Sequence, residues 1–265
     1  MVRLTKAQIQ FYKDNGYLHL KNLIKGRELE RLSEEYDNLF QRKKDSALES
    51  SWVGTDGDRE GKSELTVKGI HNLQMHHEVF ARYLYNEDLL DALEDVMGTK
   101  NIVLHHTKAH TKPPEKGASY AMHQDYHYFR YEKHSMVAAT LFLDASNEEN
   151  GTLFVYPGSH KLGPLEDIGA KEGSDFHYLD QEKYPIEKAT PVIADPGDVL
   201  IFSYFTIHGS PPNRSTQSRR ILLVQVADAD DRQVDGFPDK PCRGLVLRGV
   251  NKFKDANIFR RNQYD

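Results

Sequence analysis

The first hundred residues carry apolar side chains mostly at helical spacing. Thr5 is a residue type favoured at helix N-termini, and a helix is predicted from about Lys6 to Asn15 with its apolar side chains on one face. Gly16 is a typical helix stop. Residues 17–20 (YLHL) then alternate as a short strand does, so the chain is predicted to open with a helix and a strand.

Two further helices are predicted before residue 99. Leucine and aromatic residues recur every three or four positions from about Arg27 to Lys44, which indicates an amphipathic helix. The next helix is predicted from about His77 to Met97 and is ended by Gly98. Residues 45–64 are polar and rich in Gly, Ser and Asp without periodicity, so we expect a long mobile loop of the kind that often serves as a lid.

The pattern changes after residue 100. Short runs rich in Val, Ile, Phe, Tyr and Thr alternate with turn residues, and several end in NG, PG or PP. These runs are NIVLHHTKAH, YAMHQDYHYF, MVAATLFLDA, TLFVYPGS, GDVLIFSYFTIHGS and RRILLVQVADA. Helices followed by many short strands predict an α+β chain whose second half is a β-sandwich or barrel. Residues 160–190 form a polar insertion between strands and a second candidate lid.

Composition and charge narrow the range of functions. The chain has 265 residues, and 35 Lys and Arg against 40 Asp and Glu give a formal net charge of −5. This balance argues against a nucleic-acid binder and against docking on an anionic membrane, and no apolar run approaches the roughly 20 residues that span a bilayer. The single cysteine, Cys242, excludes an internal disulfide and a cysteine-based zinc or iron–sulfur site. We expect a cytoplasmic protein, and nothing in the pattern indicates an obligate protein partner.

Thirteen histidines are many for this length, and two of them suggest a metal site. His123 and Asp125 lie in an extended stretch, where positions i and i+2 face the same side. His208 lies at the end of another strand-like run. Two imidazoles and one carboxylate on one side of a metal form the facial triad of non-haem Fe(II) oxygenases. The His-x-Asp pair alone is weak evidence, because one or two such pairs arise by chance in a chain with this many histidines and acids.

An arginine on the following strand supports the metal-site interpretation. Arg219 comes eleven residues after His208, and a hairpin would bring its strand back beside the first one. An inward guanidinium there suits bidentate pairing with the far carboxylate of a 2-oxo diacid that chelates the metal. Ser210 shares the face of His208 and is able to donate to the same carboxylate. Arg220 is the equal alternative by composition, since strand alternation lets only one of the two arginines face inward.

Three ordered stretches resemble the phytanoyl-CoA dioxygenase family. They are residues 123–129 (HQDYHYF), 149–161 (ENGTLFVYPGSHK) and 208–215 (HGSPPNRS). The opening helix followed by NGYLHLKNLI is similar to the family as well, so the resemblance runs from about residue 5 to residue 228. The motifs stand in family order and are followed by the arginine, which makes the set much more specific than any one motif.

The resemblance implies a double-stranded β-helix (jelly-roll, cupin-like) core with the N-terminal helices packed outside. It implies an Fe(II) site with the ligands His123, Asp125 and His208. It implies a 2-oxoglutarate site formed by Arg219 and Ser210. Two looser matches, Lys108 and Thr140, fall where the family lines its co-substrate pocket. The chain is then expected to be a single domain over residues 1–265, with a helical part at about 1–98, the jelly-roll core at about 99–230 and a C-terminal tail at 231–265.

The implied reaction uses O2 and 2-oxoglutarate to hydroxylate a C–H bond of a small molecule, with release of succinate and CO2. Asp125 favours hydroxylation, because halogenases of this fold have a small residue at that position. His127 follows Asp125 by two residues and is a candidate substrate contact, and Trp52 in the long loop is another.

Two alternatives stay open. The first is a cupin-like protein that binds a metal or ligand without catalysis, although such a protein needs no buried arginine after its last ligand. The second concerns the substrate, for which we favour a free metabolite over an acyl-CoA ester. A CoA ester would need a basic groove for its phosphates, and the basic residues expected near the pocket mouth are Lys112, Lys116, Arg130 and Lys133.

Overall fold

The computed structural model describes residues 3–45, 50–52, 67–115, 117–174, 176–234 and 242–252. Its α-helices are α1 (Lys6–Asn15), α2 (Gly26–Asp45), α4 (Glu78–Tyr83), α5 (Glu87–Met97) and α6 (Ile168–Lys171). Its 3₁₀ helices are η1 (Leu73–Met75), η2 (Asp125–His127), η3 (Ser159–Leu162) and η4 (Ile186–Lys188). Its strands are β1 (Tyr17–Leu20), β2 (Ser50–Trp52), β3 (Val67–His71), β4 (Ile102–Lys112), β5 (Tyr120–His123), β6 (Val137–Phe142), β7 (Phe154–Val155), β8 (Thr190–Pro191), β9 (Val199–Ser203), β10 (His208–Ser210), β11 (Arg219–Asp228) and β12 (Val246–Arg248).

Local sequence signals fix the opening of the chain. The Thr5 side chain accepts a hydrogen bond from the backbone N–H of Gln8, and the Gln8 side chain accepts one from the backbone N–H of Thr5, which forms a capping box. Gly16 ends α1 in the left-handed conformation, at φ 79°. The predicted first helix and the short strand after it are therefore confirmed.

The helix predicted over residues 77–97 is wrong as one element, because the structure contains two. The helix α4 ends at Tyr83, and Asn86 then begins α5 by accepting a hydrogen bond from the backbone N–H of Leu89 at 2.9 Å. Asn is a strong N-cap residue, and its preference for the cap outweighs the apolar periodicity that continues across the break. The predicted stop at Gly98 is confirmed, at φ 69°.

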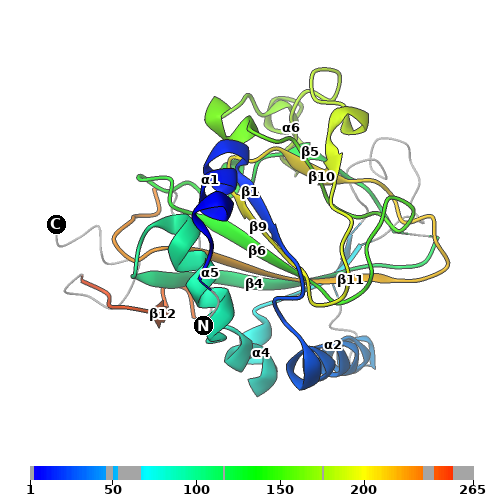
Figure 1. Cartoon of the computed structure of the whole chain (residues 1–265). Coiled ribbons are helices and arrows are strands. Elements are labelled where there is room, and N and C mark those ends of the chain that lie inside the picture. The colour runs from blue at the N-terminus through cyan, green and yellow to red at the C-terminus, as the bar shows by residue number, and fades with distance from the viewer. Residues whose placement is uncertain are drawn as a thin grey trace.

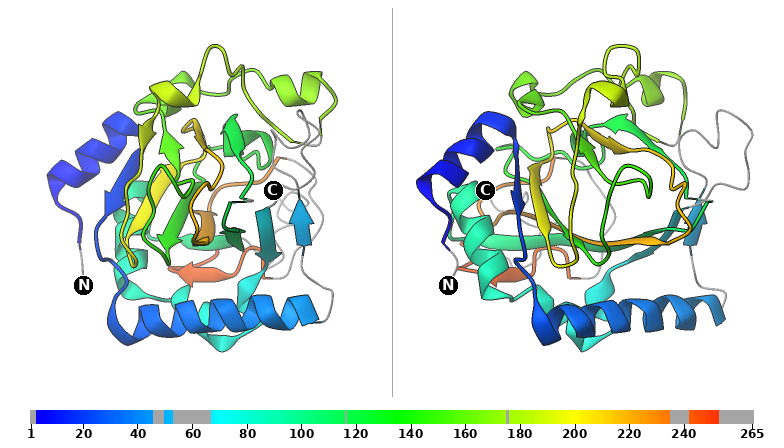
Figure 2. Two further views of the ribbon diagram at one scale, coloured as in Figure 1. Left: turned by 90° about the vertical axis from the view of Figure 1, so that its right-hand side faces the viewer. Right: turned by 45° about the vertical axis from the view of Figure 1, so that its right-hand side comes forward.

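Two antiparallel sheets face each other and form the jelly-roll that the sequence predicts. The larger sheet has the order β1-β9-β6-β11-β4-β3-β2, with β12 paired to β4, and the smaller one has the order β5-β10-β7-β8. In Figure 1 the helices α2 and α4 lie below the larger sheet, and the segment around α6 lies at the top. Figure 2 shows α2 running along the bottom of the molecule in both views.

The larger sheet is buried on both faces, which explains why its interior strand β6 is buried at every position. Its outer face packs against the helices in one apolar cluster, which includes Leu32 and Tyr36 of α2 and Leu222 and Val224 of β11. Its inner face packs toward the smaller sheet in a second cluster, which includes Phe142. The space between the two sheets is where a site can form.

Strands also occur outside the predicted core boundaries. β1, β2 and β3 precede residue 99 and join the larger sheet, and β12 lies in the predicted tail. β2 lies inside the predicted loop 45–64 and pairs with β3, so that part of the loop prediction is wrong; residues 46–49 and 53–64 lie outside the described residues. These short edge strands gain stability from pairing with a sheet that already exists, which their own sequences do not reveal.

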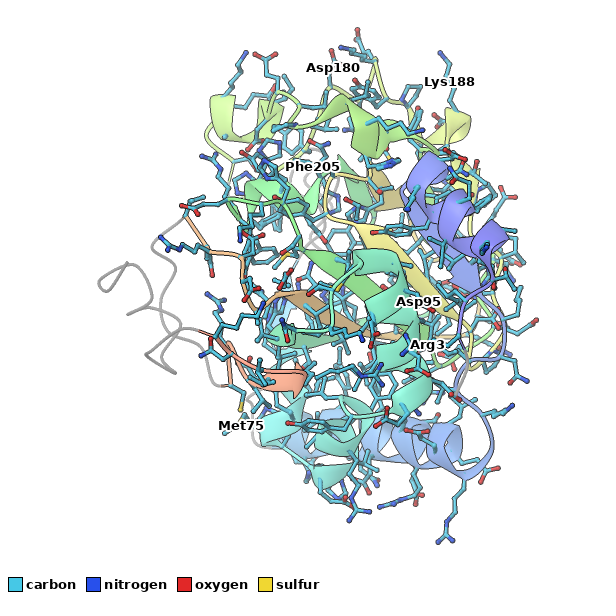
Figure 3. The ribbon with its side chains drawn as sticks, turned by 60° about the vertical axis from the view of Figure 1, so that its left-hand side comes forward. Arg3, Met75, Asp95, Asp180, Lys188 and Phe205 are labelled. Atoms are coloured by element: carbon cyan, nitrogen blue, oxygen red, sulfur yellow. The ribbon has the colours of Figure 1, made fainter. Side chains whose placement is uncertain are left out.

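Hydrogen bonds and ion pairs attach the residues after β1 and the N-terminus to the rest of the fold. Asp198, 1% exposed before β9, accepts hydrogen bonds from Lys21 Nζ at 2.8 Å and from the backbone N–H of Asn22 at 2.7 Å. Figure 3 shows Arg3 beside Asp95 of α5, where the two side chains are 3.1 Å apart. In the described ranges, no helix is long and apolar enough to cross a membrane.

We expect Asp198→Asn to lower the free energy of unfolding by about 2–3 kcal/mol at pH 7, because a buried charged acceptor of several hydrogen bonds is lost. Burial alone would raise the pKa of Asp198, but the hydrogen bonds from Lys21, Asn22 and Asp195 outweigh it and hold the pKa below its ordinary value. The ionised form therefore stabilises the folded state above about pH 4, and this contribution disappears as the pH falls through the lowered pKa.

Urea denaturation of both proteins between pH 7 and pH 3 measures this difference. Asp195→Asn is the matched control, because Asp195 is exposed and donates to Asp198 only through its backbone N–H. A difference between wild type and Asp198→Asn that is constant down to pH 3 would contradict the assignment.

Candidate metal centre

Strand pairing brings the two histidines of the predicted triad together. In the antiparallel ladder of β5 and β10, His208 lies directly opposite His123, and their ring centroids are 4.2 Å apart. The register shifts after this pair, so that Ser210 lies opposite Tyr120. Gly209 sits at the shift, where a Cβ atom would come within 2.6 Å of the Met122 sulfur and 2.8 Å of the Tyr120 carbonyl oxygen. Only glycine fits there, which explains the His-Gly-Ser sequence.

Asp125 completes the group from a different element. It begins the 3₁₀ helix η2 directly after β5, so the strand alternation that predicted its direction does not apply. Its Oδ1 nevertheless lies 3.7 Å from Nε2 of His123 and 3.7 Å from Nε2 of His208. The ligand atoms of the three residues all lie within 4.8 Å of one another, a spacing that can hold a metal ion. One face of such an ion would stay open.

Backbone carbonyl groups set the orientation of both imidazoles. His123 Nδ1 lies 2.8 Å from the carbonyl oxygen of Ala121, and His208 Nδ1 lies 3.0 Å from that of Thr206. A carbonyl oxygen only accepts, so both Nδ1 atoms carry the proton and both Nε2 atoms present a lone pair to the centre. This is the arrangement in which metal-binding histidines are typically held.

Gln225 on β11 orients the carboxylate, a role that no pattern in the sequence predicts. Its Nε2 donates to Asp125 Oδ2 at 2.7 Å, which leaves Oδ1 for the centre between the two histidines. Gln225 lies 100 residues after Asp125 and matches no motif. Its only sequence signal is its position on the inner face of β11, six residues after Arg219.

The charge states at neutral pH suit a cation. Burial and the neighbouring His123 lower the pKa of His208 to about 4, so its ring is neutral. Burial alone would raise the pKa of Asp125. The neighbouring His208 and His123 lower it by a larger amount, so the net pKa lies below the ordinary value. A neutral imidazole at His208 and an ionised carboxylate at Asp125 are protonation states that metal binding requires.

The centre lies on the wall of a cavity of about 320 Å³ between the two sheets. Its lining combines polar residues of β4 with aromatic residues from β5, the turn after η2, the insertion over residues 160–190, and β9. Apart from the triad, the polar and aromatic residues among them are His71, His106, Lys108, His110, Tyr120, Tyr128, Phe129, Thr140, Phe176, His177, Phe202, Ser210 and Gln225. Asp125 is the one carboxylate among the lining residues of the described ranges.

Alternation on β11 points the two arginines to opposite faces. Arg219 is 2% exposed and faces inward beside Tyr36 and Tyr120, and its Nε and Nη1 have no hydrogen-bond partner. Burial lowers its pKa to about 10, so the guanidinium is still charged at neutral pH. Arg220 faces outward, with Nη2 2.6 Å from Asp144 Oδ1. The inner arginine is thus a buried cation with donors to spare, which is rare in folded proteins.

Comparison with known proteins identifies the family. A sequence profile of phytanoyl-CoA dioxygenase (PhyH) matches residues 12–221. The peroxisomal phytanoyl-CoA dioxygenase of Bos taurus is 31% identical to this chain, over 96% of the chain and 79% of its own length. The chain belongs to the phytanoyl-CoA dioxygenase family. The resemblance seen in the three sequence motifs is therefore confirmed.

Other similar proteins differ in the compounds they are named for. A probable alpha-ketoglutarate-dependent hypophosphite dioxygenase of Stutzerimonas stutzeri is 27% identical over 83% of this chain and 77% of its own length. The structure of EctD from S. alaskensis with 2-oxoglutarate and 5-hydroxyectoine has a TM-score of 0.68 at 21% identity, and the match covers 92% of this chain and 83% of EctD. At that identity the structural likeness shows the fold alone.

The four less specific site predictions, for Lys108, Thr140, His127 and Trp52, have different outcomes. Lys108 and Thr140 both line the cavity, and Thr140 Oγ1 is buried without a hydrogen-bond partner. His127 is not among the lining residues of the described ranges, because η2 turns the chain and Tyr128 reaches the cavity in its place. Trp52 lies on β2, and its side chain is outside the described part of the structure.

The insertion over residues 160–190 contributes residues that the sequence analysis did not assign. Phe176 and His177 line the cavity, and Asp167 Oδ2 lies 2.5 Å from His177 Nδ1, which fixes the imidazole. Gln124, between the two triad residues of β5 and η2, ties the insertion down by donating to Gly163 and accepting from the backbone N–H of Leu165. The histidine-glutamine-aspartate motif therefore links the centre to the segment above it.

We expect Gln225→Leu to weaken Fe(II) binding by about 10- to 100-fold, because the carboxylate loses the donor that orients it. Anaerobic metal titration measures the dissociation constant, and thermal unfolding of the metal-free protein checks that the fold is intact. Gln225→Glu should weaken binding less, since a protonated glutamic acid is still able to donate to Asp125. Unchanged Fe(II) affinity in a folded Gln225→Leu protein would show that Gln225 does not act through the metal centre.

Proposed function

We propose that this protein is a non-haem Fe(II)- and 2-oxoglutarate-dependent dioxygenase that hydroxylates a C–H bond of a small molecule. The observation that carries the proposal is that a potential metal triad lines a cavity whose wall residue Tyr120 lies beside a buried guanidinium with two unpartnered donors. A protein that only binds a metal has no use for that arginine, because burying its charge without a partner is costly.

The donor set fits Fe(II). His123 and His208 would bind through Nε2 and Asp125 through Oδ1, and each ligand's other polar atom is already held by a carbonyl oxygen or by Gln225. Two nitrogen ligands and one carboxylate are the ligand set of the 2-His-1-carboxylate oxygenases. The carboxylate of Asp125 also occupies the position that a halogenase would leave to chloride, which favours hydroxylation.

The opposite end of the same region fits 2-oxoglutarate. Arg219 offers Nε and Nη1, two buried donors without a hydrogen-bond partner, and a guanidinium is the side-chain cation best suited to pair with a carboxylate. Ser210 lines the cavity near it, and Thr140 adds a buried hydroxyl without a partner. Lys108 brings a positive charge to the cavity wall. In this proposal Arg219 and Ser210 hold the distal carboxylate, while Lys108 and Thr140 line the path to the metal.

When bound, iron and 2-oxoglutarate supply the activation of O2, with succinate and CO2 as products besides the hydroxylated substrate. The chain itself orients the bound molecules and keeps water away from the cavity. Arg219 would fix which end of the diacid reaches the triad, and Phe129, Phe176 and Phe202 keep the cavity wall apolar around it. A substrate C–H bond held against the open face of the centre is then the group that reacts.

A free small metabolite fits the cavity better than an acyl-CoA ester. Of the four basic residues expected to form a CoA groove, Lys112 is fully buried and Lys133 Nζ donates to the carbonyl oxygen of Asp230. Arg130 stacks over the Tyr126 ring at 5.6 Å, and Lys116 is outside the described residues. Relatives named for phosphonates, hypophosphite and phytanoyl-CoA all occur, so family membership alone does not choose between these substrates.

Anaerobic titration of the metal-free protein with Fe(II) and then 2-oxoglutarate tests the proposal. We expect a visible charge-transfer band from the chelated 2-oxo acid in the wild type. Arg219→Leu should bind Fe(II) normally but weaken 2-oxoglutarate binding by at least about tenfold, because one charge-assisted bidentate pair is lost. Arg220→Gln is the control, since Arg220 lies on the outer face of the same strand beside Asp144.

Two outcomes contradict the proposal. If the folded wild type binds Fe(II) but gives no band at millimolar 2-oxoglutarate, the non-catalytic metal-binding alternative replaces the oxygenase. If Arg219→Leu and Arg220→Gln bind 2-oxoglutarate equally well, the co-substrate does not use the buried arginine.

A further inference from the structure

Lys112 is a buried cation behind the proposed co-substrate pocket. It is the last residue of β4, it is 0% exposed, and it is the cross-strand neighbour of Arg219. Its ammonium donates to Ser210 Oγ at 2.7 Å and to the carbonyl oxygen of Pro211. The carbonyl oxygen of Ser210 itself lies 3.4 Å away. These contacts hold the ammonium group of Lys112 against Ser210.

This contact determines what the Ser210 hydroxyl is able to do. An ammonium group only donates hydrogen bonds, so Ser210 Oγ must be the acceptor from Lys112. The proton of the hydroxyl then points away from Lys112, and within the described residues no acceptor for it is found. Ser210 is 1% exposed and lines the cavity, so that proton is left facing the cavity.

We propose that Lys112 is a positioning residue for the co-substrate, which turns Ser210 into an obligate donor toward the distal carboxylate of 2-oxoglutarate. This inference rests on the proposed function, because it needs a carboxylate at the end of the cavity formed by Ser210 and Tyr120, beside Arg219. Lys112 acts through Ser210 and does not itself line the cavity among the described residues.

Charge supports the same role. Lys112 and Arg219 lie directly opposite each other on β4 and β11, and like charges at such positions are unfavourable by themselves. A carboxylate bound at this end of the cavity would relieve that repulsion in a region of low dielectric, where the effect is strong. A neutral residue at position 112 should therefore weaken the preference for a 2-oxo diacid over a 2-oxo monoacid.

The test compares two 2-oxo acids on anaerobic Fe(II) protein, with the visible band as the readout. 2-Oxoglutarate has the distal carboxylate, and 2-oxobutyrate chelates through the same atoms but lacks it. We expect Lys112→Met to weaken 2-oxoglutarate binding by about tenfold, the size of one charge-assisted hydrogen bond. We expect the affinity for 2-oxobutyrate to stay within about twofold, because that acid makes no contact at this end.

A double-mutant cycle shows whether Lys112 acts through Ser210. If it does, Lys112→Met should have little further effect on 2-oxoglutarate binding in a Ser210→Ala protein. Lys188→Met is the matched control, because Lys188 is an exposed lysine on η4 at the top of the molecule in Figure 3. It should leave both affinities unchanged.

Lys112→Gln keeps the test decisive if Lys112→Met does not fold. A glutamine amide both donates and accepts, so the hydroxyl of Ser210 is no longer forced to point into the cavity. Lys112→Gln should therefore also reduce the preference for 2-oxoglutarate over 2-oxobutyrate, and Lys112→Arg, which again only donates, should restore part of it.

Each contrary result has a separate meaning. Equal losses of affinity for both acids mean that Lys112 has a purely structural role. Full additivity of Lys112→Met with Ser210→Ala means that Lys112 does not act through the hydroxyl. Either result overturns the inference. A normal wild-type band with unchanged 2-oxoglutarate binding in Lys112→Gln overturns the inference alone. A wild type that binds Fe(II) without any band overturns the proposed function and this inference with it.

Discussion

The pairing of β5 with β10 is the constraint on which the candidate centre depends. Its register puts His123 opposite His208, and a slip by one residue would turn one of the two imidazoles away from the cavity. Gly209 fixes this register, because a side chain at that position would collide with Met122 and Tyr120. Asp125 joins the pair from η2, so the three candidate ligands are held by the backbone of three short segments rather than by flexible loops.

The larger sheet supplies residues that support the candidate ligands, and they lie on its strand β11. Its strand β11 alternates between a helix-facing side and an inner side, and the inner side carries the buried Arg219 at its start and the cavity-lining Gln225 further along. Gln225 reaches the candidate metal centre through Asp125, and Arg219 lies six residues earlier on the strand, directly opposite Lys112 of β4. One strand therefore sets both the orientation of a ligand and the distance from the centre to the buried cation.

The sequence predicted most of the fold and the triad, because these leave signals in local patterns or in a family motif. The helix cap at Thr5 and the spacing of His123, Asp125 and His208 are examples. The break at Asn86 was missed, since capping preference competes there with a continuing apolar pattern.

The roles of Gln225, Lys112 and His177 were also missed, for a different physical reason. Each acts through contacts made across strands or with a residue of another segment, and its local sequence contains no trace of that partner. Lys112 was expected near the pocket mouth as part of a basic groove, but the fold buries it completely. The direction in which a side chain points was predictable only where strand alternation holds, as for Arg219 and Arg220. It was not predictable where η2 replaces the strand after His123.

Anaerobic crystals of the protein grown with Fe(II) and 2-oxoglutarate test the central claim most directly. The anomalous signal of iron should lie between Nε2 of His123, Nε2 of His208 and Oδ1 of Asp125. The electron density of 2-oxoglutarate should run from that signal to the guanidinium of Arg219. An iron signal elsewhere, or a diacid bound at the triad with its distal carboxylate away from Arg219, would contradict the account.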